Sequence, residues 1–165
     1  QDRITGTADL NTGMAVPVVW DGAAASLPPT IDNSHKFAMP GGNVMYSWSH
    51  DAARGRWLTV ANTNDPDLAH HWQDQRNVAE ILAVSDADFS KGLAPRSIGY
   101  LVAPGEIDDG MTRAEALRKT GMQYWIHEVL GDTWHLTTRA GIDGSVNHHD
   151  SNYALYTALD LTGLP

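Results

Sequence analysis

The sequence predicts a mainly β protein, a sandwich or a barrel-like antiparallel sheet, with one or two short helices. Turn-forming residues are frequent, with 16 Asp, 15 Gly and 8 Pro in 165 residues. Glu and Lys, which commonly coat exposed helices, number only 4 and 3. Trp and Tyr supply most of the aromatic residues, and such rings suit strands. An α+β fold is the alternative.

Four strands are predicted in the first 62 residues. Residues 3–9 alternate weakly, and residues 15–20 are apolar and β-branched, with a proline that favours an edge or a bulge. Residues 21–42 have no hydrophobic period and are predicted as a long irregular stretch. Residues 43–49 and 56–62 alternate and are predicted as a hairpin.

The middle of the chain mixes helix and strand signals. An Asn-Asp-Pro-Asp sequence at residues 64–67 is a helix-start signal, which predicts a short helix over 66–74. Residues 77–84 form an apolar run that is too short to distinguish helix from strand. Residues 96–103 predict a strand, one face of which is expected to carry Ile98, Tyr100 and Val102.

One helix, over residues 112–120, is predicted from the signals at its two ends. Thr112 can cap its first turn and Glu115 follows three residues later, which together make a capping box. Arg118 and Lys119 suit the last turn, and the glycine at 121 ends the helix. The sequence therefore predicts a short helix packed on a sheet.

The strongest hairpin joins residues 122–130 to residues 133–139 through the two-residue turn Gly131-Asp132, which suits a type II′ turn. A turn of this length fixes the register. The predicted pairs are Leu130–Thr133, Val129–Trp134, Glu128–His135, His127–Leu136, Ile126–Thr137 and Tyr124–Arg139. The face predicted to enter the core carries Trp125, Val129, Trp134 and Leu136. The other face carries Tyr124, Ile126, Glu128, His135, Thr137 and Arg139. Residues 153–161 are predicted as a closing strand, with a helix as the alternative.

Composition excludes several classes of function. The net charge of -9 disfavours a phosphate backbone as partner. Without cysteine there is no disulfide, thiolate metal site or cysteine nucleophile. No apolar run approaches the ~20 residues of a membrane span. We therefore expect one β-rich domain over residues 1–165 that binds neither nucleic acid nor membrane.

Histidine is abundant, with eight residues. His148, His149 and Asp150, which follow Asp143, offer the nitrogen and oxygen donors that divalent metals use. Adjacent histidines in an extended segment point to opposite sides, however, and no second pair at metal-binding spacing follows. We therefore expect neither a metal site nor a cofactor.

The predicted hairpin register places a carboxylate opposite an imidazole. Glu128 could orient the His135 ring and raise its basicity, which is the arrangement used in general acid–base catalysis. An exposed cross-strand ion pair is the alternative. On the same face Tyr124 and Arg139 could bind a substrate. The aromatic candidates for a stacking platform are Trp48, Trp57 and Trp72.

Three function classes follow. The first is a non-catalytic, secreted or virion-surface module that binds glycan or a protein neighbour in a structural or adhesion role, with a homo-oligomer left open. The second is a small acid–base enzyme, a hydrolase, lyase or isomerase, that uses Glu128 and His135. The third is a calycin-like carrier with an apolar cavity lined by Trp125, Trp134 and Ile98. A pocket around His135 would favour the enzyme, and an open surface the module.

Overall fold

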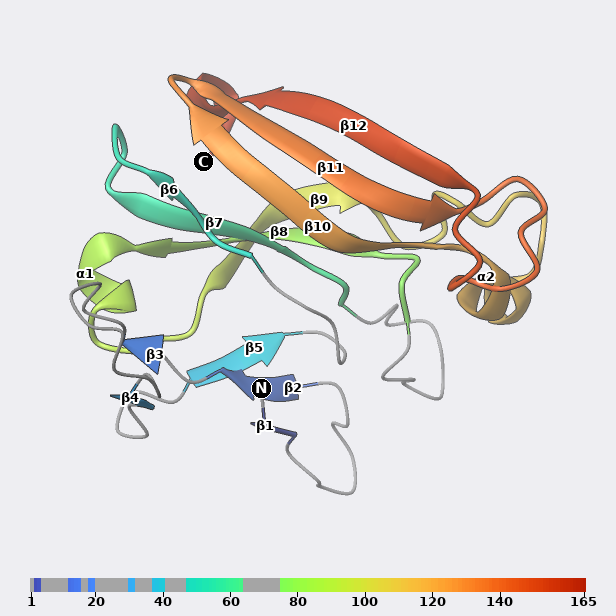
Figure 1. Ribbon diagram of the computed structural model, residues 1–165, viewed down its shortest axis with the longest axis horizontal. Coiled ribbons are helices and arrows are strands. Elements are labelled where there is room, and N and C mark those ends of the chain that lie inside the picture. The colour runs from blue at the N-terminus through green and yellow to red at the C-terminus, as the bar shows by residue number, and fades with distance from the viewer. Residues whose placement is uncertain are drawn as a thin grey trace.

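Strands make up most of the secondary structure, as the composition predicted (Figure 1). The structure is a computed structural model that describes residues 2–3, 12–15, 18–19, 30–31, 37–40, 47–63 and 75–165. Its strands are β1 (Asp2–Arg3), β2 (Thr12–Ala15), β3 (Val18–Val19), β4 (Thr30–Ile31), β5 (Phe37–Pro40), β6 (Ser49–Asp51), β7 (Arg56–Ala61), β8 (Ala79–Ser85), β9 (Arg96–Val102), β10 (Gly121–Leu130), β11 (Thr133–Gly141) and β12 (Tyr153–Asp160). Its helices are α1 (Asp86–Phe89), α2 (Arg113–Lys119) and a 3-10 helix (Leu161–Gly163). None of these described helices is long and apolar enough to cross a membrane.

Two antiparallel sheets build the larger part of the described structure. One has the strand order β6-β7-β8-β9 and the other β10-β11-β12. Shorter strands form the sheets β1-β2-β5 and β3-β4. In Figure 1 the β10–β12 sheet lies over one side of the β6–β9 sheet, and β5 lies on the opposite side. The β6–β9 sheet is therefore the middle layer.

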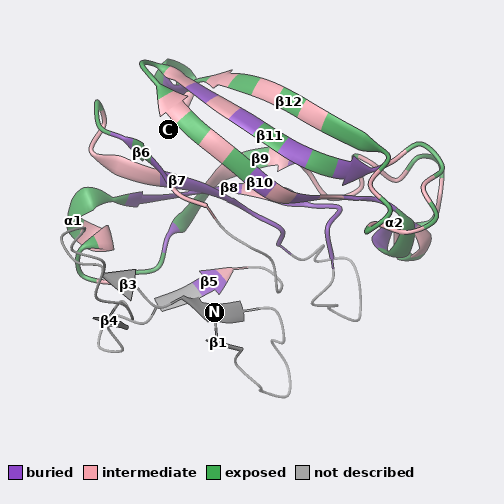
Figure 2. Ribbon diagram, in the orientation of Figure 1, coloured by how far each residue is buried: buried purple, intermediate pink, exposed green. Residues whose placement is uncertain are grey.

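The main hydrophobic core lies between the β6–β9 and β10–β12 sheets. It includes Leu58 from β7, Ile81 from β8, and Trp134 and Leu136 from β11. A second cluster, Met39, Ala61 and Leu82 with Trp48 beside it, packs on the other side of the middle sheet. β7 and β8 are thus largely buried on both faces. β10 and β11 instead alternate between more and less buried residues, and β12 alternates between half-buried and exposed ones (Figure 2).

The register of the β10–β11 hairpin is confirmed from the turn outward for five pairs, Leu130–Thr133, Val129–Trp134, Glu128–His135, His127–Leu136 and Ile126–Thr137. Its predicted core face is also confirmed, since Trp125, Trp134 and Leu136 are buried and Val129 packs against the same core. The positive φ of +60° at Gly131 explains why glycine occupies the first turn position.

The Tyr124–Arg139 pair is wrong by one residue. A bulge between Gln123 and Ile126 shifts the register, so Arg139 lies opposite Gln123. Tyr124 has a φ of +58°, a left-handed conformation that a regular strand does not contain. A hairpin turn fixes only the pairs that an unbroken ladder connects to it, which is why the prediction failed beyond the bulge.

The predicted common face of Ile98, Tyr100 and Val102 is also wrong. β9 shifts register twice against β8, so that Tyr100 pairs with Glu80 and Val102 with Ala79. Ile98 and Val102 reach the core, but Tyr100 is 52% exposed. The charge of Glu80 raises the pKa of Tyr100, which agrees with this placement.

The remaining predictions have mixed outcomes. The capping box and helix at Thr112 are confirmed, and residues 153–161 contain the predicted strand, β12. The apolar run 77–84 belongs mostly to β8. The irregular stretch 21–42 was mispredicted in part, because β4 and β5 lie within it and are held by strands distant in sequence. The predicted helix over 66–74 lies outside the described residues.

Close contacts attach the start of β10 to the middle sheet. The Asn62 side-chain amide donates to the carbonyls of Val78 and Met122, both at 2.8 Å, and the Met122 N–H donates to the Arg76 carbonyl at 2.7 Å. A Cβ at Gly121 would lie 2.3 Å from the Cβ of Arg76, so only glycine fits there. One end of the hairpin is thereby fixed against the sheet below it.

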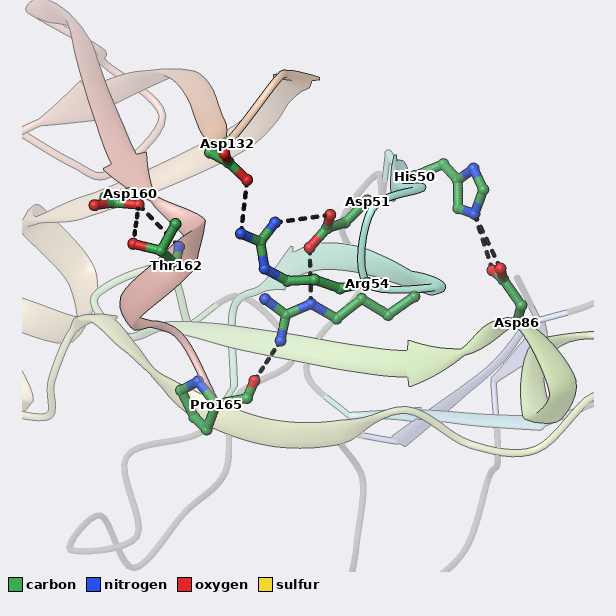
Figure 3. Close-up of polar contacts among 9 residues, drawn as sticks. His50, Asp51, Arg54, Asp86, Asp132, Asp160, Thr162 and Pro165 are labelled. Carbon is green, nitrogen blue, oxygen red and sulfur yellow. Dashed lines mark hydrogen bonds and ion pairs between the residues drawn. The ribbon is translucent and has the colours of Figure 1, made fainter.

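An ion-pair cluster fixes the other end (Figure 3). The fully buried Asp51 carboxylate accepts from Arg54 at 3.1 Å and from Arg56 at 3.0 Å. Arg54 also binds Asp132 in the β10–β11 turn at 2.7 Å, and Arg56 donates to the carbonyl of Pro165. The β6–β7 turn, the β10–β11 turn and the segment after β12 are therefore held together.

Replacing the most central indole tests the predicted core face. Trp134→Ala is expected to lower the free energy of unfolding by about 3–5 kcal/mol, because it leaves a cavity between the sheets. Glu128→Gln and His135→Gln should leave the fold intact, because these side chains lie on the opposite face of the hairpin. Urea unfolding of the three variants measures this. Unfolding of either control while Trp134→Ala stays stable would contradict the assignment of faces.

A second stability prediction concerns the buried carboxylate. Asp51→Asn is expected to cost about 3–5 kcal/mol, because the partly buried Arg56 loses its carboxylate partner and Arg54 keeps only the exposed Asp132. Asp86→Asn is the matched control, since Asp86 pairs with His50 in a solvent-exposed position and should change stability by less than about 1 kcal/mol. Equal effects in thermal or urea unfolding would show that Asp51 is not a structural centre.

Candidate binding face

The candidate site is the outer face of the β10–β12 sheet, which we call the outer face. The opposite side of this sheet packs on the main core, so alternate residues of each strand point away from it. Exposed positions recur along all three strands in Figure 2. The outer face carries Ile126, Glu128, Leu130, Thr133, His135, Thr137, Arg139, Ala154, Tyr156 and Ala158.

The structure places Glu128 and His135 directly opposite each other, as the sequence predicted. The hydrogen bond of His135, however, joins its Nδ1 atom to the hydroxyl of Tyr156 at 2.7 Å, and the two rings stack at 6.1 Å. Tyr156 comes from β12, where it pairs with Thr137. The imidazole is therefore oriented by a phenol instead of by the carboxylate, and the acid–base role stays a prediction.

Tyr124 and Arg139 meet in spite of the shifted register. The Arg139 guanidinium lies 5.3 Å from the centre of the Tyr124 ring, a cation–π distance. Its Nε atom donates to Ser151 Oγ at 2.8 Å, and Nη2 donates to the carbonyl of His149 at 2.7 Å. Arg139 is thus held in place by the loop that follows β11, with its aromatic contact on the outer face.

A depression of about 600 Å³ lies along the edge of β10 that faces β6. It is lined by Trp48, Ser49, His50, Ile126, His127, Glu128, Val129, His135 and Thr137. At this edge the hydroxyls of Ser47 and Ser49 donate to the carbonyls of Trp125 and His127, both at 2.9 Å. Two serine side chains therefore occupy acceptors that a neighbouring strand would otherwise bind.

His127 lies beneath this depression, between the two sheets. Its Nδ1 atom is 2.7 Å from Ser49 Oγ, and its ring meets Trp134 edge-on at 5.0 Å. Burial lowers the pKa of His127 to about 4, an effect that the carbonyl of Ser47 partly opposes. The imidazole is therefore neutral at physiological pH.

The three tryptophans proposed as stacking platforms have different positions. The Trp57 ring stacks with His50 at 4.6 Å and with Phe89 of α1 at 5.0 Å. Trp48 meets Phe89 edge-on at 5.4 Å and packs beside the second core cluster. Both indoles thus belong to a half-buried aromatic cluster, and Trp48 also lines the depression. Trp72 lies outside the described residues.

The histidine-rich loop after β11 is tied to the structure through its backbone. The carbonyl of His148 accepts from Gln123 at 2.8 Å, and its N–H donates to the Arg118 carbonyl at 3.0 Å. The rings of His148 and His149 lie 4.2 Å apart, so they do not diverge as adjacent residues of an extended segment would. Within the part of the chain that the structure describes, no three His, Cys, Asp or Glu side chains gather as a metal site would require.

Sequence reasoning missed Tyr156, the residue that binds His135. The register of the first hairpin followed from its turn, but residues 153–161 had no short turn to set their pairing with β11. The available signal was the alternation of Ala154, Tyr156 and Ala158, which places these three side chains on one face of a strand.

Comparison of this chain with protein-family models, with curated proteins and with solved structures finds no match.

The depressed pKa of His127 predicts a pH-dependent stability. The unfolded chain binds a proton near pH 6.5 and the folded chain only near pH 4, so stability is complete above pH 6.5 and falls as the pH decreases to 4. Lowering the pKa from 6.5 to about 4 corresponds to about 3 kcal/mol, which is the expected loss of stability. His127→Gln should flatten this dependence in urea unfolding, whereas His135→Gln should retain it. The same slope in both variants would contradict the prediction.

Proposed function

We propose that this chain is a non-catalytic β-sandwich module whose outer face binds a protein neighbour. Three large apolar side chains carry the proposal: Ile126, Leu130 and Tyr156 are 67%, 56% and 63% exposed. They surround Glu128 and His135 on a rigid three-stranded sheet. Apolar and aromatic side chains beside oriented polar groups are typical of protein interfaces.

The character of these side chains favours a protein over a glycan. Aromatic ring faces bind sugars, but the rings of Tyr124 and Tyr156 already contact Arg139 and His135. Ile126 and Leu130 gain free energy only when apolar area leaves water, about 25 cal/mol per Å². A protein partner supplies the apolar surface that such burial requires. The secreted or virion-surface location belongs to this proposal and rests on composition alone.

The acid–base enzyme is the second candidate, and the depression of about 600 Å³ beside Glu128 and His135 favours it. The hydrogen bond between His135 and Tyr156 gives the ring a partner other than the carboxylate that catalysis would need. For the carrier, an apolar cavity of about 390 Å³ includes Trp125 in its lining, but Trp134 is fully buried in the packed core. Unlike the enzyme and the carrier, the binding module gives a role to the exposed side chains of Ile126, Leu130 and Tyr156.

A site-specific photo-crosslinker tests the proposal. Placed at Ile126 and exposed to extract of the source cells, it is expected to trap one protein that excess unlabelled wild-type chain displaces. The matched control is a crosslinker at Leu93, which is 50% exposed in the connection between α1 and β9. The purified partner should then bind Ile126→Lys at least about tenfold more weakly than wild type and should bind Leu93→Lys unchanged.

Two outcomes would overturn this function. Equal crosslinking from Ile126 and Leu93, or equal affinity of the two lysine variants, would show that the outer face is not the binding surface. Binding on a glycan array that Tyr156→Ala and Arg139→Ala abolish would assign the face to a carbohydrate instead.

A further inference from the structure

Strand β12 presents a long, regular edge. It pairs with β11 over eight residues without a register shift, and among the described strands it pairs with no other. The N–H of Leu161, just beyond β12, donates to the Asp132 carbonyl. Because the backbone groups of successive strand residues point to alternate sides, the N–H and C=O groups of the odd-numbered residues of β12 point toward β11. The backbone groups of Ala154, Tyr156 and Ala158 therefore point away from the sheet.

The other edges of the two main sheets carry features that oppose strand pairing. Serine hydroxyls cover carbonyls along β10, β9 shifts register twice, and β6 is only three residues long. Such features prevent uncontrolled association of sheet edges. Residues 153–159 of β12 contain no charge, proline or glycine, so β12 has none of the usual protection.

We propose that β12 pairs antiparallel with β12 of a second copy of this chain, joining two three-stranded sheets into one sheet of six strands. The position of the charge in β12 permits a second copy to pair there without repulsion. The charged residue of β12 is Asp160 at its end, and two-fold pairing places it opposite uncharged Asn152 or Ala154 of the other copy. The two Asp160 carboxylates then lie about 27 Å apart along the strands when Tyr156 is at the centre.

A cavity beside the same edge supports this partner. The apolar cavity of about 390 Å³ is lined by Leu155, Thr157 and Leu159 on the core side of β12, together with Tyr100, Trp125 and others. A strand added next to β12 carries the same side chains toward this side of the sheet. Pairing therefore gives apolar neighbours to side chains that one copy alone leaves half-buried.

Pairing of β12 does not depend on the proposed function of the outer face, because it uses backbone groups at the edge of the sheet. A dimer would make the outer faces of the two copies continuous, so that two binding sites could engage a repeated partner together.

Sedimentation equilibrium of the wild-type chain is expected to show a dimer. Ala158→Pro should weaken the dimer at least about tenfold: its N–H points away from β11, so proline removes a donor to the second copy and leaves the fold intact. Ile126→Lys is the matched control, on the outer face and away from β12. Circular dichroism confirms that both variants are folded.

Single cysteines define the geometry, because the natural chain has none. Two-fold pairing of β12 can be centred on Tyr156 or on Thr157. In either register the central residue lies opposite the same residue of the second copy, at a Cα–Cα distance of about 4.5–5.5 Å, which a disulfide can span. Oxidation of Tyr156→Cys or Thr157→Cys should therefore yield a covalent dimer, and Ile126→Cys should not. A monomer at about 100 µM, or a dimer that Ile126→Lys dissociates and Ala158→Pro does not, would overturn edge pairing. The second result would leave the outer face as the interface.

Discussion

The two sheets depend on one buried charge, the Asp51 carboxylate. A carboxylate without access to water is costly, and here the guanidinium groups of Arg54 and Arg56 both compensate it. Because Arg54 also holds Asp132 and Arg56 holds Pro165, the stabilisation of a single anion fixes the positions of two turns and the segment after β12. Asn62 performs a similar role at the opposite end through the carbonyls of Val78 and Met122.

The two sheets, which these contacts hold together at both ends, have different roles. The middle sheet is buried on both faces of β7 and β8, so its side chains serve mainly to pack. The β10–β12 sheet packs on one face and leaves the other in solvent, where it displays apolar and polar groups on a rigid support. Candidate functional residues therefore lie on the outer face and at the β12 edge, while serine hydroxyls keep the β10 edge occupied.

Part of the candidate site follows from local rules. A two-residue turn at Gly131 brings Glu128 opposite His135, and alternation then separates the core face of the hairpin from its outer face. The same reasoning fails at Tyr124, because a bulge changes the count of residues on one strand and not on the other. It also omits Tyr156, whose strand is joined to β11 by a long loop that sets no register.

The sequence by itself determined the mainly β class, the capping box at Thr112 and the pairing nearest the hairpin turn, because these depend on residues within a few positions of one another. Only the tertiary structure decided that Trp57 stacks on Phe89, that His135 binds Tyr156 and that His127 is neutral. Each of these outcomes depends on a side chain or a degree of burial supplied by a distant strand or helix. Periodicity identifies the face on which a residue lies, but only packing decides which groups meet there.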